Sequence, residues 1–515
     1  LDDFLTVEPE EGLAVDPPWE VRILRTDVAL YLAMTFYEPE PERMVLQNER
    51  RDAVLEEDDR IEFLFDTFAD GKTAYFFQVS AGGSRGDALI GDNGRRFNKP
   101  WNGFWEASVI RLPDRWVAEV RIPFDTMSFG SGDVWRANFE RFRGADRSIS
   151  RWSGARRAFR LSTVNQAREL AGFAGAQQGL GVEFRPFLKL DGRDGSLTED
   201  DGFHLDGGGE VSWRLTPQLT AAMTWNTDFA ETEVDERRVN LSRFPLFFPE
   251  KRDFFLQDST LFQFGEQGGQ FGSGGGNLVP FFSRRIGLVD DSVVPIEAGA
   301  RLAGRAGPWD LGFLGVRTEE VAGIGVPAGD LFVLRPALRV GEEVTVGGLL
   351  TSGSPATDAS NTVVGGDVRW SSSTWLPCNF NLNAFVVGSD DEATDSTGLG
   401  FGVEANYRNE DWIYALRTLG SHEDFQPALG FVQRPGEWLT TGSVEWQPRP
   451  ASSTVRNYAF SIDPTIWTDL NGDLVSGSLR VTPFEVEWHN GDQFEVAISH
   501  DRDIVDTDFE ISDGV

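Results

Sequence analysis

The sequence predicts an all-β protein in which an N-terminal antiparallel β-sandwich precedes a transmembrane antiparallel β-barrel of 16 or more strands. Fifty-six glycines and 40 phenylalanines in 515 residues favour short strands joined by turns. Beyond about residue 180 the strands lengthen, and apolar side chains alternate with a period of two. There, tight turns also alternate with longer polar loops, which is typical of barrels that cross an outer membrane. A chain of this length is too long for one ordinary core, which favours two domains.

The composition argues against several classes of function. Acidic residues outnumber basic ones by 82 to 47, and a formal net charge of -35 argues against nucleic acid as a partner. Cys378 is the single cysteine, and the four histidines lack the spacing of zinc ligands. The sequence contains no serine nucleophile elbow, HExxH motif or phosphate-binding loop. We therefore expect no metal, no cofactor and no catalytic residues.

The sequence has no run of about 18 apolar residues, so we expect no membrane-spanning helix. A β-barrel is then the remaining structure with which this chain could cross a membrane. Because the chain starts at Leu1 rather than Met, we expect that a signal peptide has been removed.

Residues 1–165 consist of short β-rich segments separated by turn residues, which predicts an antiparallel sandwich. The segments "DDRIEFLFDT", "FWEASV", "RWVAEVRIPFDTMSF" and "WRANFERF" occur in an order that resembles the carbohydrate-binding module family 9 type of domain, also called DOMON-like. The resemblance implies the sandwich fold and a glycan-binding-like module.

In sugar-binding relatives, exposed tryptophans stack on sugar rings while polar side chains bind hydroxyl groups. Trp101 lies in a loop between Pro100 and Asn102, so both stacking on a sugar and packing in the core stay open for it. Trp105, like Trp116 and Trp135, lies in strand-like sequence, which favours a place in the core. The candidate sugar-binding residues are Trp101, Trp105, Arg95 and Asn98, with Asp92 nearby.

Residues 166–515 carry the alternation expected of membrane strands. In "LFVLRPALRV", Phe332 and Leu334 would share one face, and Val333 and Arg335 the other. About fifteen such segments can be counted, each close to the ~9 to 11 residues that a tilted membrane strand needs. Because bacterial barrels of this kind have an even number of strands, we expect 16 or more. The chain ends at "DTDFEISDGV", where a new strand begins, so we expect the natural barrel to continue.

The connections predict the orientation of the barrel. Tight turns such as "RVGEEV" and "WHNGDQ" alternate with polar loops such as "GSDDEATDST" and the stretch 232–295. If the first long loop is external, the N-terminal domain lies in the periplasm. We therefore expect a location in the bacterial outer membrane, with outer-membrane lipid and lipopolysaccharide, oligosaccharide and an envelope protein as the candidate partners.

The stretch 232–295 contains "NLSRFPLFFPEKRDFFLQDSTLFQF", which carries seven phenylalanines without a helical or strand period. So many apolar side chains argue against disorder, and we expect the stretch to fold inward as a plug or lid. The charges within it would then need polar partners, such as Arg301, Arg305 and Glu297. The candidate pore and plug residues are Phe247, Phe248, Glu250, Lys251, Arg252, Asp253, Arg301, Arg305, Arg335 and Arg339.

This stretch, with "FFSRRIGL" and "FQPALGFVQRPGEW", resembles a family of uncharacterised bacterial proteins. In that family, a carbohydrate-binding module family 9-like domain precedes an outer-membrane β-barrel. The resemblance implies this architecture for nearly the whole chain and says little about biochemistry.

Three functions stay open. The first is an outer-membrane channel or transport protein whose periplasmic module binds glycan or another polar ligand. Strand faces would place arginines on one wall of the lumen and Glu445, Glu485, Glu487 and Glu495 on the other, which would either select polar solutes or pair across a plugged lumen. The second is a membrane anchor or structural partner in an envelope assembly. The third is a glycoside hydrolase-type enzyme, which needs two carboxylates about 5 to 9.5 Å apart. We favour a protein that is not an enzyme.

The segment "TDLNGDL" resembles part of a calcium loop, with Asp469, Asn471 and Asp473 at alternate positions. Arg480 stands where an EF-hand would place its bidentate glutamate, so we favour an Asn-Gly hairpin turn.

Overall fold

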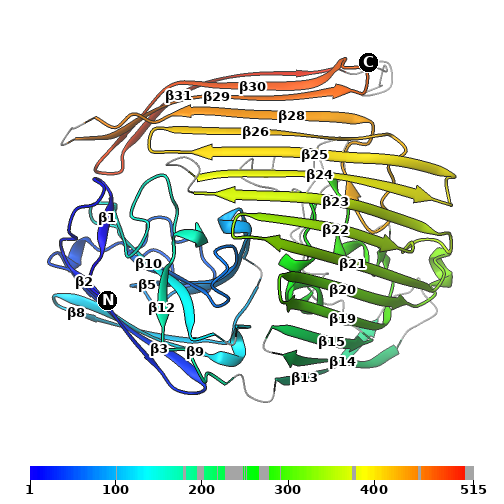
Figure 1. Cartoon of the computed structure of the whole chain (residues 1–515), viewed down its shortest axis with the longest axis horizontal. Coiled ribbons are helices and arrows are strands. Elements are labelled where there is room, and N and C mark those ends of the chain that lie inside the picture. The colour runs from blue at the N-terminus through cyan, green and yellow to red at the C-terminus, as the bar shows by residue number, and fades with distance from the viewer. Residues whose placement is uncertain are drawn as a thin grey trace.

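The computed structural model is nearly all-β and has two parts (Figure 1). It describes residues 1–99, 101–130, 132–177, 181–193, 202–216, 218–226, 247–248, 250, 252–265, 278–289, 292–373, 379–450 and 454–504. Within these residues, no helix is long and apolar enough to cross a membrane. The all-β fold predicted from the sequence is confirmed.

The first part is an antiparallel β-sandwich, drawn in blue and cyan in Figure 1. One sheet has the order β1-β11-β10-β4-β5-β6-β7, with β12 also paired to β10, and the other has the order β2-β3-β9-β8. The strands are β1 (Leu5–Glu8), β2 (Trp19–Arg25), β3 (Ala29–Tyr37), β4 (Arg60–Asp66), β5 (Ala74–Ser80), β6 (Arg85–Gly91), β7 (Arg96–Asn98), β8 (Glu106–Leu112), β9 (Arg115–Pro123), β10 (Val134–Arg143), β11 (Ser148–Arg151) and β12 (Arg168–Ala171). Short 3-10 turns occur at η1 (Pro41–Arg43), η2 (Asp92–Gly94), η3 (Phe124–Thr126) and η4 (Val164–Gln166).

The sandwich core is aromatic and lies between the two sheets. Trp116 and Trp135 are fully buried, and Trp105 is nearly so, which confirms their predicted place in the core. Phe173 stacks on Trp135 with ring centroids 3.9 Å apart. Because β12 and Phe173 belong to the sandwich, this domain extends beyond the predicted boundary at residue 165. The segment "RELA" of β12 is short and charged, so its sequence does not predict a strand.

The second part is one antiparallel sheet that contains fifteen strands within the described residues. Each strand pairs with its neighbour in the chain order, except where the short β16, β17, β18 and β27 intervene, and β13 and β31 are the two edge strands. The predicted sixteenth strand falls on residues 505–515, which lie outside the described residues. The strands are β13 (Val182–Arg193), β14 (Gly202–Thr216), β15 (Leu219–Trp225), β19 (Ile296–Ala306), β20 (Trp309–Thr318), β21 (Gly329–Val340), β22 (Val344–Ser352), β23 (Asn361–Ser372), β24 (Asn379–Asp391), β25 (Ser396–Arg408), β26 (Trp412–Ser421), β28 (Glu437–Trp446), β29 (Val455–Asp469), β30 (Leu474–Trp488) and β31 (Gln493–Asp503).

Alternation along these strands gives the sheet two different faces. In β21, Val333, Arg335 and Ala337 are buried on one side, whereas Phe332 and Leu334 are exposed on the other, as the sequence predicts. We call the buried side the inner face and the exposed side the outer face. The outer face is apolar, because large hydrophobic side chains are exposed on strand after strand: Phe184, Met223, Phe313, Phe332, Leu334, Val346, Val364, Val386, Val403, Leu416, Val444, Ile466 and Ile498.

The connections agree only in part with the prediction of long loops at one end. β15 and β19 are joined by a long stretch, and β26 connects to β28 through residues 422–436. The predicted loop "GSDDEATDST" is wrong, because β24 continues to Asp391 and β25 begins at Ser396. At the end of β24, Ser389 and Asp391 are buried and Asp390 is exposed, which is the alternation of a strand, so polarity alone does not identify a loop. Residues 468–474 form the expected tight turn, in which Asp469 accepts the backbone N–H groups of Asn471 and Asp473.

The described part of the phenylalanine-rich stretch lies against the inner face, as predicted. We call residues 247–265 and 278–289, where described, the inner segment. Phe254, Phe255, Phe262 and Phe264 are buried and pack with inner-face residues such as Leu314 and Phe385. Residues 240–246, 249 and 251 lie outside the described residues. The inner segment contains α1 (Asp253–Leu256), η6 (Ser259–Leu261), β16 (Leu278–Val279), η7 (Ser283–Arg285) and β17 (Leu288–Val289). β16 pairs with β27 (Phe431–Val432), and β17 pairs with β18 (Ser292–Val293). Outside this segment, the short turn η8 (Ala322–Ile324) lies between β20 and β21.

Candidate functional site

The candidate site is the space on the inner face of the large sheet, where the inner segment meets the sandwich. Arg335 in β21 is almost completely buried there, and its guanidinium lies 2.8 Å from the carboxylate of Asp367 in β23 of the same sheet. Its Nε also donates to the Gln263 carbonyl at 2.9 Å, and its guanidinium lies over the Phe264 ring. A buried ion pair needs such additional hydrogen bonds, because the desolvation of both charges is unfavourable. Arg335 thus fixes the end of the inner segment to the large sheet.

The charges of the inner segment find partners mostly within that segment. Arg252 forms an ion pair with Glu250 at 2.7 Å and donates to the carbonyls of Ile286 and Ser283. The pKa of Glu250 is lowered, because Arg252 and the hydroxyl of Ser283 outweigh the effect of burial. Phe247 stacks on Phe282 with centroids 4.8 Å apart, and Arg284 lies over the Phe248 ring. Lys251 and the side chain of Asp253 lie outside the described part of the chain.

Two of the three predicted neighbours of these charges are wrong. Arg301 does reach the segment, because it donates to the Phe254 carbonyl at 2.6 Å and to Gln257 Oε1 at 2.9 Å. Arg305 instead contacts the sandwich. Glu297 is exposed on the outer face, where it pairs with Arg317 at 3.0 Å. β19 carries a bulge next to Glu297, and this extra residue changes which side chains point inward.

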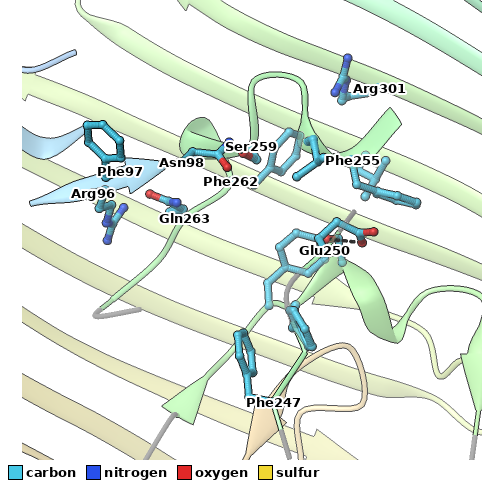
Figure 2. Close-up of a pocket in the computed structure, with 15 residues that line it drawn as sticks. Arg96, Phe97, Asn98, Phe247, Glu250, Phe255, Ser259, Phe262, Gln263 and Arg301 are labelled. Atoms are coloured by element: carbon cyan, nitrogen blue, oxygen red, sulfur yellow. Dashed lines mark hydrogen bonds between the residues drawn. The ribbon is translucent and has the colours of Figure 1, made fainter. Parts of the chain in front are cut away.

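A cavity of about 310 Å³ lies between the inner segment and the wall (Figure 2). Strand β7 of the sandwich reaches it with Arg96 and Asn98, and Asn98 donates to Ser259 Oγ at 2.9 Å. Most of the other lining side chains are aromatic or apolar, with a few polar groups among them: Phe247, Glu250, Phe255, Leu256, Phe262, Gln263, Phe281, Phe282, Ser283, Arg301 and Leu314. An apolar pocket with a few convergent polar groups is the usual form of a small-molecule site.

The sandwich docks against the end of the sheet that carries the tight turns. Lys72 Nζ donates to Thr345 Oγ1 at 3.0 Å, next to the turn between β21 and β22. Similar contacts occur along several neighbouring turns: Arg305 with Asp70, Arg95 with Glu404, Gln166 with Ser373, Arg157 with Glu410, Arg449 with Glu8, and Arg456 with the carbonyls of Asp146 and Arg147. Because these contacts span strands from β19 to β29, the sandwich covers this end of the inner face.

The contact around Arg305 is the most buried of the set. Arg305 holds Asp70 at 2.6 Å and Asp310 at 3.0 Å, donates to Thr73 Oγ1, and lies over the Phe68 ring. Burial raises the pKa of the nearby Asp66 to about 7, with the neighbouring Asp70 carboxylate as the second cause. Burial also acts on Asp70, but Arg305 and hydrogen bonds lower the pKa of Asp70 overall. The two carboxyl groups therefore differ in charge near neutral pH.

The predicted sugar-binding residues do not form one exposed site. Trp105 is buried and donates from Nε1 to Asp87 at 2.8 Å. Trp101 packs against Tyr75 and Phe77 and is partly buried, so its ring is not free on the surface of the sandwich. Phe104, by contrast, is 88% exposed. Arg95 and Asn98 bind residues of the second part of the chain. Sugar binding at Trp101 stays a prediction.

Several charges of the predicted basic and acidic walls have partners of opposite charge. Arg339 lies 3.4 Å from Asp310, and Glu487 lies within 3.7 Å of Arg147 and Arg456. Glu495 is exposed and pairs with Arg480. Among the described residues, no group of three His, Cys, Asp or Glu side chains is placed to hold a metal ion.

Sequence reasoning missed the acidic partners of the inner arginines. Asp70 lies in a sandwich loop, and Asp367 and Glu404 lie on inner faces of strands. The alternation in "GGDVRW" and "FGVEANYR" places Asp367 and Glu404 on the same faces as Arg369 and Arg408, so a charge within an alternating strand was the available signal.

Comparisons with known proteins give the following matches. Residues 181–295 match the family described as domain of unknown function DUF5916. Among curated proteins, none matches. A putative carbohydrate-binding protein from Bacteroides uniformis is 15% identical, over 33% of this chain and 86% of its own, with a TM-score of 0.27.

Two outer-membrane structures match a larger share of this chain. OccAB2 from Acinetobacter baumannii is 10% identical over 86% of this chain and 91% of its own, with a TM-score of 0.30. The outer membrane protein OprD from Pseudomonas aeruginosa is 9% identical over 94% of both chains, with a TM-score of 0.28.

Proposed function

We propose that this chain is an outer-membrane channel protein that the inner segment and the docked sandwich hold closed. The observation that carries the proposal is the apolar outer face of the large sheet. In a water-soluble sheet such a face would be covered by another layer, because exposed apolar patches of this extent are unfavourable in water. In a membrane, the same face would contact lipid, while the ion pairs stay on the inner face.

A row of aromatic rings on the large sheet supports a membrane location. Trp412 lies at the first position of β26, directly after a tight turn, and its ring is 5.9 Å from that of Trp446. The row continues across neighbouring strands, through Phe460 at 5.3 Å, Phe484 at 6.3 Å and Phe494 at 6.5 Å. Trp and Tyr belts are typical of the level at which a membrane meets water.

The docking of the sandwich supports its assignment to the periplasmic side. It sits at the tight-turn end of the strands, and tight turns are periplasmic in bacterial outer-membrane barrels. Protease added to intact cells tests this orientation. We expect residues 1–173 to be protected, and cleavage within them on intact cells would reverse the assignment.

Single-channel conductance in planar bilayers tests whether the inner segment and the sandwich close the channel. We expect low conductance from the full chain, a marked increase when residues 240–264 are deleted, and an increase when residues 1–177 are deleted. The inner segment fills part of the inner face and the sandwich covers one end of it, so either deletion should remove an obstruction. A control that keeps both obstructions is Arg317→Gln, which changes an exposed pair on the outer face. If folded barrels that lack either segment conduct no better than the full chain, the channel proposal is contradicted.

A membrane anchor is the second candidate, and one observation favours it. The described inner face is occupied by the inner segment and capped by the sandwich, as in a barrel that serves to hold a domain at the membrane. Unchanged conductance in both deletions, together with correct insertion, would favour this function.

A further inference from the structure

We propose that a second pocket, between the sandwich and the large sheet, binds a small hydroxylated carboxylate such as a sugar acid. The pocket has a volume of about 120 Å³ and is distinct from the aromatic cavity. A single water needs ~10–15 Å³ of such volume, so the pocket has room for several waters or for one small polar solute. The inference rests on the docked arrangement of the two parts and does not require that the chain conducts solutes.

Both parts of the chain build this pocket. The sandwich contributes the turn around η2 and the segment before η4, and the sheet contributes the inner faces of β24 and β25. The two sides are joined by Arg95, which donates to Glu404 at 2.8 Å. The lining side chains are almost all polar: Asn93, Arg95, Arg160, Ser162, Thr163, Asn379, Asn381, Glu404, Asn406, Tyr407 and Arg408.

Several polar atoms of the lining lack a hydrogen-bond partner within the described part of the chain. Asn93 is 3% exposed and uses its Oδ1 to accept the Asn165 N–H, which leaves its Nδ2 without an acceptor. Asn381 is 6% exposed and donates to Asn379 Oδ1, which leaves its own Oδ1 without a donor. Asn406 Oδ1 likewise has no donor, and Arg408 Nε has no acceptor. Buried polar groups are nearly always hydrogen-bonded, so this set points to a ligand that supplies the missing partners.

The missing partners include both hydrogen-bond acceptors and hydrogen-bond donors. Asn93 Nδ2 and Arg408 Nε need acceptors, whereas Asn381 Oδ1 and Asn406 Oδ1 need donors. A hydroxyl group both donates and accepts, so several hydroxyl groups on one small molecule would satisfy the set. An inorganic anion such as phosphate offers mainly acceptors and would leave the two asparagine oxygens unsatisfied.

The charges of the lining favour an anion. The lining carries three arginines and one glutamate, and Arg95 is already paired with that glutamate. Arg408 lies near Glu445 and Glu8 as well as near the basic Arg160 and Arg449, so Arg160 and Arg408 still leave the pocket positive and attract a negative group. Arg160 is exposed and lies at the rim, whereas Arg408 is partly buried. Arginine holds carboxylates well because its planar guanidinium matches their geometry. A carboxylate that carries hydroxyl groups therefore fits both the charge and the hydrogen-bonding groups of the pocket.

Isothermal titration of the full chain in detergent micelles tests the proposal, with D-glucuronate, D-glucose and inorganic phosphate as probes. We expect glucuronate to bind at least tenfold more tightly than either of the other two. Arg160→Gln, at an exposed position that folding should tolerate, should weaken glucuronate binding at least fivefold. Asn381→Asp, which keeps the shape but adds a negative charge, should weaken it more than tenfold. Arg417→Gln is the matched control, because Arg417 lies on the inner face of the next strand and does not line the pocket.

Four results would overturn the proposal. The first is that the folded chain binds no probe at millimolar concentration, and the second is that both variants bind glucuronate as the unaltered chain does. Equal affinity for glucose would overturn the role of the carboxylate, and equal affinity for phosphate would overturn the recognition of hydroxyl groups. Binding is measured in micelles and does not depend on conductance. If neither deletion raises the conductance in bilayers while the full chain still binds glucuronate, the proposed channel is contradicted and this pocket stays in place.

Discussion

The sandwich and the large sheet use the same two-residue alternation in opposite ways. In the sandwich, Trp116 and Phe139 point into an apolar core between two sheets. In the large sheet, Phe332 and Leu334 point away from the interior, and Arg335 points inward. The period of a strand therefore specifies that two faces differ, but not which face meets water. What decides is the surroundings: a second sheet covers the apolar face in the sandwich, and we propose that lipid covers it in the large sheet.

The inner segment gives the large sheet an apolar core of its own, as the sandwich has. The large sheet has buried apolar side chains such as Leu314 and Val333 among its inner polar ones, and the phenylalanines of the inner segment pack on them. The sheet thus has a small apolar core inside it as well as an apolar face outside it. Substitutions on the three kinds of surface should differ in their effects.

The largest effect should come from the sandwich core. Trp135 is 0% exposed and contacts Phe65, Phe124, Phe129 and Phe173. Trp135→Ala should lower the free energy of unfolding of the sandwich by about 3–5 kcal/mol, because it leaves a large cavity. Urea unfolding of residues 1–177 measures this, with Phe104→Ala as the exposed control. Equal effects of the two variants would contradict the assignment of the core.

The second effect is the difference in stability when an arginine is introduced on the outer face of the large sheet or on an exposed face of the sandwich. Val386 in β24 and Ile110 in β8 are similarly exposed, at 55% and 61%. Val386→Arg should destabilise the folded barrel in lipid vesicles by about 2–4 kcal/mol, because a charge would be placed in hydrocarbon. Ile110→Arg should change stability by less than about 0.5 kcal/mol, as is usual for a surface site in water. Unfolding from vesicles by guanidinium gives both values, and a harmless Val386→Arg would argue against lipid at this face.

The third effect concerns pH and Asp66 in the full chain, where Asp66 lies near the contact between the sandwich and Arg305 of the large sheet. The raised pKa of Asp66, about 7, means that the folded state holds a proton that the unfolded state, with the ordinary value of 3.8, has already lost. Stability is then greatest below about pH 4 for this group and falls as the pH rises towards 7. Between pH 5.5 and pH 7, the expected loss is roughly 1.5 kcal/mol. Urea unfolding at the two pH values, compared with Asp66→Asn, isolates this group, and an unchanged pH dependence in the variant would contradict the assignment.

The smallest effect should come from the outer ion pairs. Arg317 contacts Glu297 and Asp330 at 3.0 and 3.2 Å, but all three side chains are more than half exposed. Arg317→Gln should cost less than about 1 kcal/mol, because water screens such pairs. Unfolding of this variant beside Arg335→Gln, which leaves Asp367 buried without its partner, should show a clearly larger loss for the inner position.

Much of the fold could be predicted because alternation and turn residues act locally. The strand content, the two parts and the inward packing of Phe254 and Phe264 follow from such patterns. The boundary at residue 165 could not, since β12 is recruited by pairing with β10 rather than by its own sequence. The loop predicted around residues 388–397 was wrong, because strands at the rim of a barrel can be as polar as loops.

The candidate site could be predicted only in part. Inner-face positions of Arg301, Arg305 and Arg335 follow from strand alternation. Their partners do not, because Asp70, Gln257 and Asp367 come from a sandwich loop, the inner segment and another strand. The docking of the sandwich depends on contacts between residues more than two hundred positions apart, such as Lys72 with Thr345, and no local pattern reports them.

The most direct test of the central claim is the environment of the outer face in a reconstituted membrane. Nitroxide labels on single cysteines at Val386 and Ile110, in a Cys378→Ser background, report accessibility to oxygen, which concentrates in lipid, and to a water-soluble nickel complex. The account predicts that the label at position 386 is relaxed mainly by oxygen and the label at position 110 mainly by nickel. Relaxation of both labels mainly by nickel would show that the apolar face of the large sheet does not meet lipid, and would contradict the account.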